Sequence, residues 1–301
     1  MSLDALGVLR ASGSGAVTFL QGQLSNDLAR LGPDRSLLAG YHNPQGRVIA
    51  VLRLIELAPQ EVLAVLPREL IGRVAQRLTK FVLRAKVKLS DESSQWRVSG
   101  VIGAAADTHG VATALPASLD AAVHSDGSVA VRVAQHPVVR WLVVTPGTAA
   151  VWSARCAPAS PQSWRQQAIA SGEPQVYAAT SEEFVAQMLN LDALGAISFE
   201  KGCYTGQEVI ARAHYRGRVK RRMQRFVSGG PCVLQPGDAA VLGDGRLLKV
   251  VDAVSASDGR CEFLAVTTTP DESAAETPAG PPAGVPRVDA QPLALPYPLP
   301  P

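Results

Sequence analysis

The spacing of apolar residues predicts that the first part of the chain is rich in short strands. An apolar run over residues 47–57 (RVIAVLRLIEL) follows the tetrapeptide Asn43-Pro44-Gln45-Gly46. In this tetrapeptide proline presets φ and glycine accepts a positive φ, so the pattern predicts a hairpin. Further strands are expected at residues 7–11, 36–40 and 62–66, and a helix at residues 67–81.

Helix signals occur in two other segments. Apolar residues recur at helical spacing over residues 16–31, at Val17, Leu20, Leu24 and Leu28. The tetrapeptide Thr180-Ser181-Glu182-Glu183 has the form of a capping box and predicts a helix that runs to about Leu189. Between these segments we expect strands at residues 82–89, 96–102, 129–135 and 138–144, and helices or loops at 108–118 and 158–166.

The last third of the chain has a different pattern. Short apolar runs separated by Gly, Asp and Pro predict a small, separate β-barrel with strands at residues 226–234, 239–242, 246–254 and 260–268. Residues 270–286 are rich in Pro, Ala, Glu and Gly and are expected to form a flexible loop. Composition alone favours a disordered tail over residues 287–301. The expected division is therefore a body over residues 1–222 and a barrel over residues 223–301.

The segment of residues 198–222 carries the strongest chemical signals. Thr205-Gly206-Gln207-Glu208 is a second capping box, which predicts a helix from Gly206 to about Tyr215. Cys203 lies just before this helix and close in sequence to Lys201. A helix N-terminus and a nearby cation both favour a thiolate, so the pattern predicts a lowered pKa for Cys203. An inert buried cysteine is the alternative.

Charge is concentrated in the same segment. Lys201–Arg225 holds eight Lys and Arg residues and one Glu, although the net charge of the whole chain of 301 residues is only +3. Such a basic run suits an anionic ligand such as a polyglutamate tail or a phosphate. A solvated helix face and a nucleic-acid patch are the open alternatives.

Composition and missing motifs exclude several classes of protein. No stretch reaches the roughly 18 apolar residues of a membrane span, and no signal peptide is apparent, so we expect a cytoplasmic protein without membrane contact. No phosphate-binding loop, dinucleotide fingerprint, hydrolase elbow or metal-ligand spacing occurs, so no metal site is expected. The four cysteines have no zinc spacing and are expected to be reduced: Cys156, Cys203, Cys232 and Cys261.

The sequence resembles a known family. Residues 201–208 (KGCYTGQE) match the K-G-C-Y-x-G-Q-E signature of the YgfZ folate-binding family. The approach at residues 189–199, the exit at residues 215–221, the first helix at residues 19–27 and the C-terminal residues 292–297 are also similar. The resemblance covers nearly the whole chain and is weakest in the middle third.

The resemblance implies an α+β fold like that of the glycine-cleavage T-protein. It consists of a folate-binding body of two subdomains and a small C-terminal β-barrel, with a tail that returns to the body. The implied function is binding of tetrahydrofolate and support of iron–sulfur enzymes, in assembly or repair of their clusters. Iron–sulfur client or assembly proteins are the implied partners, Cys203 is the implied functional thiol, and Trp164 falls where relatives carry a folate-linked Trp. The remaining expected binding residues are Asn26, Asn43, Lys201, Tyr204, Gly206, Gln207, Glu208, Arg212, Tyr215 and Arg216.

Departures from the T-protein pattern bear on catalysis. T-proteins have paired acidic residues where this chain has Ala50 and Val51, and a Glu where this chain has Ala170. Alanine and valine cannot act as a base. Leu6 stands where some family members have a Trp. Aminomethyl transfer is therefore disfavoured, but a folate-dependent transferase and a basic nucleic-acid-binding module stay open as alternatives. Of the possible partners, nucleic acid is the less favoured.

Overall fold

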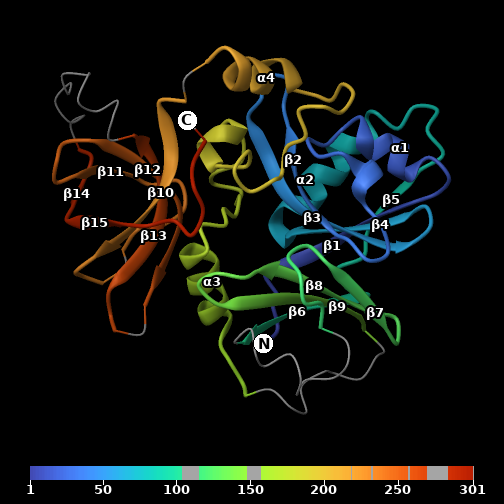
Figure 1. The fold of residues 1–301 in the computed structure, drawn as a ribbon, viewed down its shortest axis with the longest axis horizontal. Helices are drawn as coiled ribbons and strands as arrows, with labels where there is room; N and C mark the ends of the chain where they lie inside the picture. The colour runs from blue at the N-terminus through green and yellow to red at the C-terminus, as the bar shows by residue number, and fades with distance from the viewer. Residues whose placement is uncertain are drawn as a thin grey trace.

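In the part of the chain that the structure describes, three β-sheets and several short helices form the fold. The computed structural model describes residues 1–103, 115–147, 157–217, 219–231, 233–256, 258–269 and 284–300. In Figure 1 the three sheets surround α3 (Pro161–Ala170), which lies near the middle of the molecule. α3 packs against the barrel strands and also reaches the second sheet, so it connects the parts of the fold.

The first sheet has five antiparallel strands in the order β2-β3-β4-β1-β5. The predicted hairpin joins its β2 and β3 strands, and Gly46 in the turn has a φ of 72°. α2 (Arg68–Thr79) packs closely on the sheet, because a Cβ on Gly7 would lie only 2.4 Å from Cδ1 of Ile71. The strands are β1 (Leu6–Ser12), β2 (Leu37–His42), β3 (Val48–Ala58), β4 (Glu61–Pro67) and β5 (Lys88–Asp91).

The second sheet has four antiparallel strands in the order β6-β9-β8-β7. It shares a hydrophobic core with the first sheet: Val8 and Ile55 of the first pack with Val129 and Leu142 of the second. Burial of this shared apolar surface holds the two sheets together. The strands are β6 (Trp96–Gly103), β7 (Ala122–Ser125), β8 (Ser128–Ala134) and β9 (Val139–Pro146).

The C-terminal sheet is a nearly closed barrel of six strands in the order β14-β11-β12-β13-β10-β15. Its outer strands β14 and β15 follow each other along the chain, which brings the two edges of the sheet together. Cys261 on β13 is disulfide-bonded, so the expectation of a reduced thiol is wrong here; spacing along the sequence does not reveal which residues a barrel brings together. The strands are β10 (Arg221–Ser228), β11 (Ala239–Leu242), β12 (Leu247–Ser255), β13 (Cys261–Thr268), β14 (Arg287–Val288) and β15 (Ala290–Leu293).

The helix predicted over residues 16–31 is much shorter than expected. α1 (Ala16–Gln21) ends at Gly22, and a single turn of 3₁₀-helix, η1 (Leu28–Arg30), follows. The polar side chains in between bind backbone groups of other segments: Ser25 donates to the carbonyl of Ala196, and Asn26 donates to the carbonyls of Leu38 and Gly195. These bonds compete with the helix and explain its early end.

The capping box predicted at residues 180–183 is also wrong. The hydroxyl of Thr180 accepts from the backbone N–H of Tyr177, which precedes it, and Glu182 adopts a φ of 69°. Only a 3₁₀-helix, η4 (Ala186–Leu189), follows. A single hydroxyl can serve a turn as well as a helix, and here the turn prevails.

The C-terminal tail is ordered over its described residues and packs on the body. Beyond β15, the Tyr297 hydroxyl donates to the carbonyl of Gly172 at 2.7 Å and accepts from Asn190 at 3.3 Å. The composition-based expectation of disorder is therefore wrong for residues 287–300. The expected loop at 270–286 and the segment at 108–118 lie largely outside the described residues. Among the described helices, none is long and apolar enough to cross a membrane.

Candidate functional site

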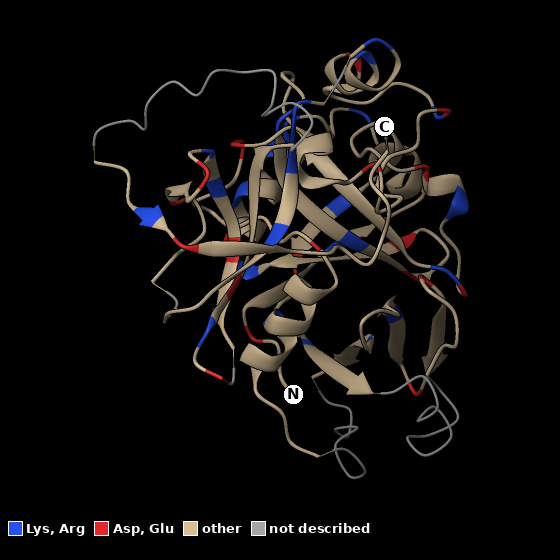
Figure 2. Ribbon diagram, turned by 60° about the vertical axis from the view of Figure 1, so that its left-hand side comes forward, with Lys and Arg blue, Asp and Glu red and all other residues tan. Residues whose placement is uncertain are grey.

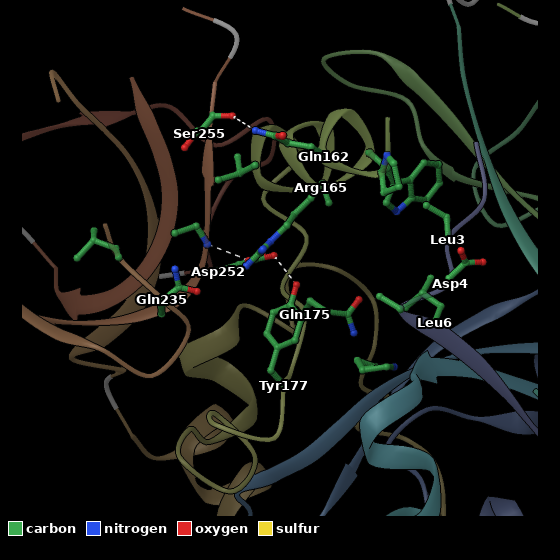
Figure 3. A pocket seen from close by; sticks show the side chains of 18 residues that line it. Leu3, Asp4, Leu6, Gln162, Arg165, Gln175, Tyr177, Gln235, Asp252 and Ser255 are labelled. Atoms are coloured by element: carbon green, nitrogen blue, oxygen red, sulfur yellow. Dashed lines mark hydrogen bonds and ion pairs between the residues drawn. The ribbon is translucent and has the colours of Figure 1, made fainter. Parts of the chain in front are cut away.

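A cavity of about 560 Å³ lies where the N-terminal segment, α3 and the barrel meet. Figure 3 shows Leu3 and Leu6 on one side, Gln235 and Ser255 on the other, and Arg165 between them. A volume in the range of roughly 300–1,000 Å³ with mixed apolar and polar walls is typical of small-molecule sites. The cavity is therefore the first candidate for a ligand site.

Asp252 of β12 is the buried acidic centre of this cavity. Its Oδ1 accepts from Nε of Arg165 at 2.6 Å, and its Oδ2 accepts from the Tyr177 hydroxyl at 3.0 Å. The backbone N–H of Ala253 donates to the same carboxylate at 2.8 Å. Burial raises the pKa of Asp252, an effect that the Arg165 guanidinium opposes, and burial also raises the pKa of Tyr177. The group is thus a fixed polar feature in a largely apolar wall (Figure 3).

Trp164 of α3 lines the same cavity and is held from two sides. The guanidinium carbon of Arg140 lies 4.7 Å from the centre of the indole, a cation–π contact. On β6, a Cβ on Gly100 would lie 2.4 Å from the ring, so only glycine admits the indole there. Arg140 is in turn ion-paired with Glu173. The indole is therefore a preorganised apolar wall.

The loop that carries Cys203 lies beside α1. Cys203 is an exposed, free cysteine. The Lys201 ammonium donates to the carbonyls of Gln21 at 2.5 Å and Leu24 at 2.6 Å, and it lies 5.0 Å from the centre of the Tyr204 ring. Burial lowers the pKa of Lys201 to about 8. Lys201 therefore ties the loop to α1, and its ammonium is directed into the body of the protein.

The predicted helix after Cys203 is present, but its start differs from the prediction. α4 (Gln207–Tyr215) follows Gly206, which has a φ of 84° and makes no side-chain cap. A Cβ on Gly206 would lie 2.6 Å from the carbonyl oxygen of Asn43, so the β2–β3 turn touches the start of α4. The expected capping box at Thr205 and Glu208 is therefore wrong, because close backbone contact requires a left-handed glycine at this point.

The basic run at Lys201–Arg225 is not a single surface. Arg222 forms a buried bidentate ion pair with Asp192, at 3.1 and 3.0 Å, and Arg225 pairs with Glu262 at 2.8 Å. Arg212 is exposed, with Glu208 3.7 Å away. Figure 2 shows Lys and Arg scattered among Asp and Glu over the strands. The structure therefore separates cations that the sequence brings together.

The residues predicted to bind a ligand lie in two places. Trp164 lines the cavity, whereas none of the other predicted residues is among its lining residues. Asn26 and Asn43 serve the backbone: Asn43 accepts from the N–H groups of Gln45 and Arg47. Tyr204 is buried, and the other predicted residues belong to the Cys203 loop and α4: Lys201, Gly206, Gln207, Glu208, Arg212, Tyr215 and Arg216.

Sequence reasoning missed the polar group of the cavity. Asp252 could have been noticed in the sequence, because it is the lone acidic residue in a mostly apolar strand (LLKVVDAVS). Arg165 and Tyr177 had none, since their roles depend on where α3 meets the barrel. Within the described residues, no group of three or more His, Cys, Asp or Glu side chains is placed to hold a metal ion.

The arrangement of the three sheets is that of a known class of protein. The structure is similar to that of the glycine cleavage system aminomethyltransferase T from Bartonella henselae, with a TM-score of 0.62 over 89% of this chain and 77% of that chain, at 11% sequence identity. The predicted T-protein-like α+β fold is thus confirmed. No family model matches the chain.

Relatives in sequence show to which family within this class the chain belongs. The tRNA-modifying protein YgfZ of Enterobacter sp. (strain 638) is 34% identical over 273 residues, which cover 86% of this chain and 82% of the relative. The protein of the same name from Vibrio atlanticus is 35% identical over 222 residues, 70% of this chain and 64% of the relative. That of Escherichia coli O157:H7 is 31% identical over 272 residues, 86% and 82% of the two chains. The chain belongs to the YgfZ family.

Proposed function

We propose that the chain binds tetrahydrofolate in the cavity and uses Cys203 to support iron–sulfur enzymes that act in tRNA modification. The observation that carries the folate proposal is the cavity itself, with Trp164 on one wall and the Asp252–Arg165–Tyr177 group on another. An aromatic wall suits the flat pterin ring by stacking. Carboxylate and amide groups suit its N–H and carbonyl edge.

The cavity residues fit such a ligand chemically. Besides Asp252, the amide side chains of Gln175 and Gln235 line the cavity and offer both donors and acceptors (Figure 3). Leu6 adds apolar surface at the place where some relatives carry a Trp. Folate would bring a one-carbon carrier to this site, and the protein side chains would bind and orient it.

Two features argue against the alternative of aminomethyl transfer. Ala50 and Val51, which stand in place of the acidic pair, are buried on β3 and carry no titratable group. Asp252 is ion-paired with Arg165 and accepts from Tyr177, so its carboxylate is held as a charged hydrogen-bond acceptor and is not free to act as a mobile base. A free base for the transfer is therefore missing among these residues, and a supporting role is favoured over turnover.

The proposal for Cys203 rests on its exposure and on the way its loop is held. The thiol is free and accessible, while Lys201 and Gly206 fix the loop on either side of it. A thiol in this setting can reach a partner protein without a change in the fold. The relatives are named as tRNA-modifying, and we place the supported enzymes in that process.

Complementation tests this proposal. In an Escherichia coli strain that lacks its own YgfZ, the wild-type gene should restore the activity of iron–sulfur enzymes, and Cys203→Ser should restore little. Gly202→Ala is the control variant in the same loop, since an added Cβ there meets nothing within 4 Å. Full rescue by Cys203→Ser at an equal protein level would disprove the proposed role of the Cys203 thiol.

A further inference from the structure

The segment between α2 and β5 presents an unusual surface. Leu83 is 91% exposed and Phe81 is 50% exposed. Lys80, Arg84 and Lys86 flank them, with Lys88 at the start of β5, and all four cations are exposed. We call this set of six outward side chains the 80–88 surface. None of its cations takes part in an ion pair between described residues.

The 80–88 surface is attached to the core of the first sheet by the residues that lie between its outward side chains. Val82, Ala85 and Val87 alternate with the outward residues and pack on the core of the first sheet. The backbone N–H of Ala85 donates to the carbonyl of Val82 at 2.6 Å, and β5 pairs with β1. Leu83 adopts a φ of 30°, a strained conformation for this residue type. Strain that keeps a large apolar side chain in solvent points to a binding role.

The neighbouring residues leave the positive charge uncompensated. Residues 13–21, which include α1, contain no charged residue. Two nearby carboxylates, Glu61 and Glu92, are both paired with Arg10, and Asp91 accepts from Ser93. The partner of this surface should therefore carry negative charge and also flat or apolar groups that cover Phe81 and Leu83.

We propose that the 80–88 surface docks RNA, with its cations on phosphates and Phe81 and Leu83 against unstacked bases. Cations interleaved with an exposed aromatic ring are the usual means of binding single-stranded nucleic acid. The inference rests on the proposed place of the chain in tRNA modification, the process named for its relatives. A loop of tRNA, where bases are unstacked, is the part that fits best.

The surface also lies close to the thiol loop. The Lys86 carbonyl accepts from Gly15 at the start of α1, and Lys201 binds the Gln21 carbonyl at its end. α1 has six residues and rises about 9 Å at 1.5 Å per residue. RNA on the 80–88 surface would therefore lie beside the Cys203 loop. The basic run that the sequence favoured has three of its cations turned inward: Lys201, Arg222 and Arg225.

The proposal is tested with a fluorescently labelled tRNA transcript. Its binding is measured by fluorescence anisotropy at salt concentrations from about 50 to about 200 mM. The triple variant Lys80→Ala, Arg84→Ala, Lys86→Ala should bind at least about tenfold more weakly, with a salt slope smaller by about 2–3. Phe81→Ala with Leu83→Ala should also weaken binding. The matched control Arg30→Ala, Arg221→Ala, Arg287→Ala removes the same charge from scattered exposed sites and should bind like the wild type.

Several results would overturn the proposal. The first is absence of tRNA binding by the wild type at low salt. The second is an equal loss of tRNA affinity in the scattered control and the triple variant. The third is binding to anionic vesicles, in place of tRNA, that depends on the cations of the 80–88 surface. Titration of tetrahydrofolate into the triple variant separates this proposal from the folate proposal. Unchanged folate binding by the triple variant shows that this variant is folded. If the wild type binds tRNA but not folate, only the folate proposal is disproved.

Discussion

His42 is a buried histidine whose two ring nitrogens have no hydrogen-bond partner among the described residues. It is 1% exposed, and its ring lies 6.1 Å from that of Tyr204 beneath the Cys203 loop. Burial lowers its pKa from 6.5 to about 3, so the folded protein holds the neutral imidazole. At the scale of single residues, this group and Asp252 show that the polar groups near the candidate sites are buried at a cost in stability.

Replacement of His42 should change the response of stability to acid. Because the folded pKa lies below the unfolded one, the unfolded state binds the proton first as pH falls below 6.5, and stability falls until about pH 3. We predict that His42→Leu flattens this loss by about 1 kcal/mol per pH unit, measured by urea denaturation between pH 7 and pH 4. The exposed His124→Leu should follow the wild type. Parallel curves for His42→Leu and the wild type would contradict the account.

At the scale of elements, the start of α4 is fixed by backbone contact with the β2–β3 turn. Gly206 supplies a positive φ and leaves room for the carbonyl of Asn43. The other end of this segment is fixed by Arg222, whose guanidinium also donates to the carbonyl of Gln187 in η4. The Cys203 loop and α4 are thus held at both ends, and each point of attachment can be tested separately.

The contact at Gly206 should be sensitive to a single methyl group. We predict that Gly206→Ala destabilises the protein by about 1–3 kcal/mol, because alanine is strained at this φ and its Cβ would lie 2.6 Å from the Asn43 carbonyl. Thermal unfolding and the alkylation rate of Cys203 should both change. Gly202→Ala is the matched control, since a Cβ there meets nothing within 4 Å. Equal effects of the two substitutions would disprove the contact.

The Arg222–Asp192 pair should be structural. Both side chains are almost fully buried, at 4% and 5% exposure. We predict that Arg222→Met destabilises the protein by about 3–5 kcal/mol in urea, because it leaves the Asp192 carboxylate without its partner. Exposed Arg221→Met should change stability by no more than about 0.5 kcal/mol. If Arg222→Met lowered stability only slightly, the structural role would be wrong, and Arg222 would become a candidate for ligand binding.

At the scale of the whole molecule, the three sheets meet around α3 and are joined again by the C-terminal tail (Figure 1). Tyr297 lies near the end of the described chain, yet its hydroxyl reaches Gly172 just after α3 and Asn190 beside η4. Burial raises its pKa, as expected for a phenol enclosed by the body. The tail therefore helps to hold the barrel against the body, on which the shape of the cavity depends.

The tail contact should contribute measurably to stability. We predict that Tyr297→Phe costs about 1–3 kcal/mol in urea denaturation, since it leaves the buried Gly172 carbonyl without its donor. Tyr215→Phe is the matched control, because the Tyr215 side chain is 66% exposed. If both variants unfolded like the wild type, the packing of the tail would be incidental.

Local signals in the sequence explain how far the fold could be predicted. The Pro44–Gly46 turn and the apolar runs beside it define the β2–β3 hairpin, and the helix signal near Gly206 gives α4. The contacts of Lys201, Arg222 and Asp252 could not be predicted from the sequence. Their partners lie tens to hundreds of residues away, and only the packed fold shows which long side chain meets a buried acceptor. The Cys203 loop stood out through local signals, its cysteine, its glycines and its charge, whereas the role of Trp164 came from family resemblance.

The most direct test of the central claim is calorimetric titration of tetrahydrofolate into the purified protein. We predict saturable binding by the wild type, at least about tenfold weaker binding by Trp164→Ala because a stacking wall is lost, and unchanged binding by Cys203→Ser. Each variant must show a cooperative unfolding transition. No binding by the wild type, or binding that depends on Cys203 and not on Trp164, would contradict a folate site in the cavity.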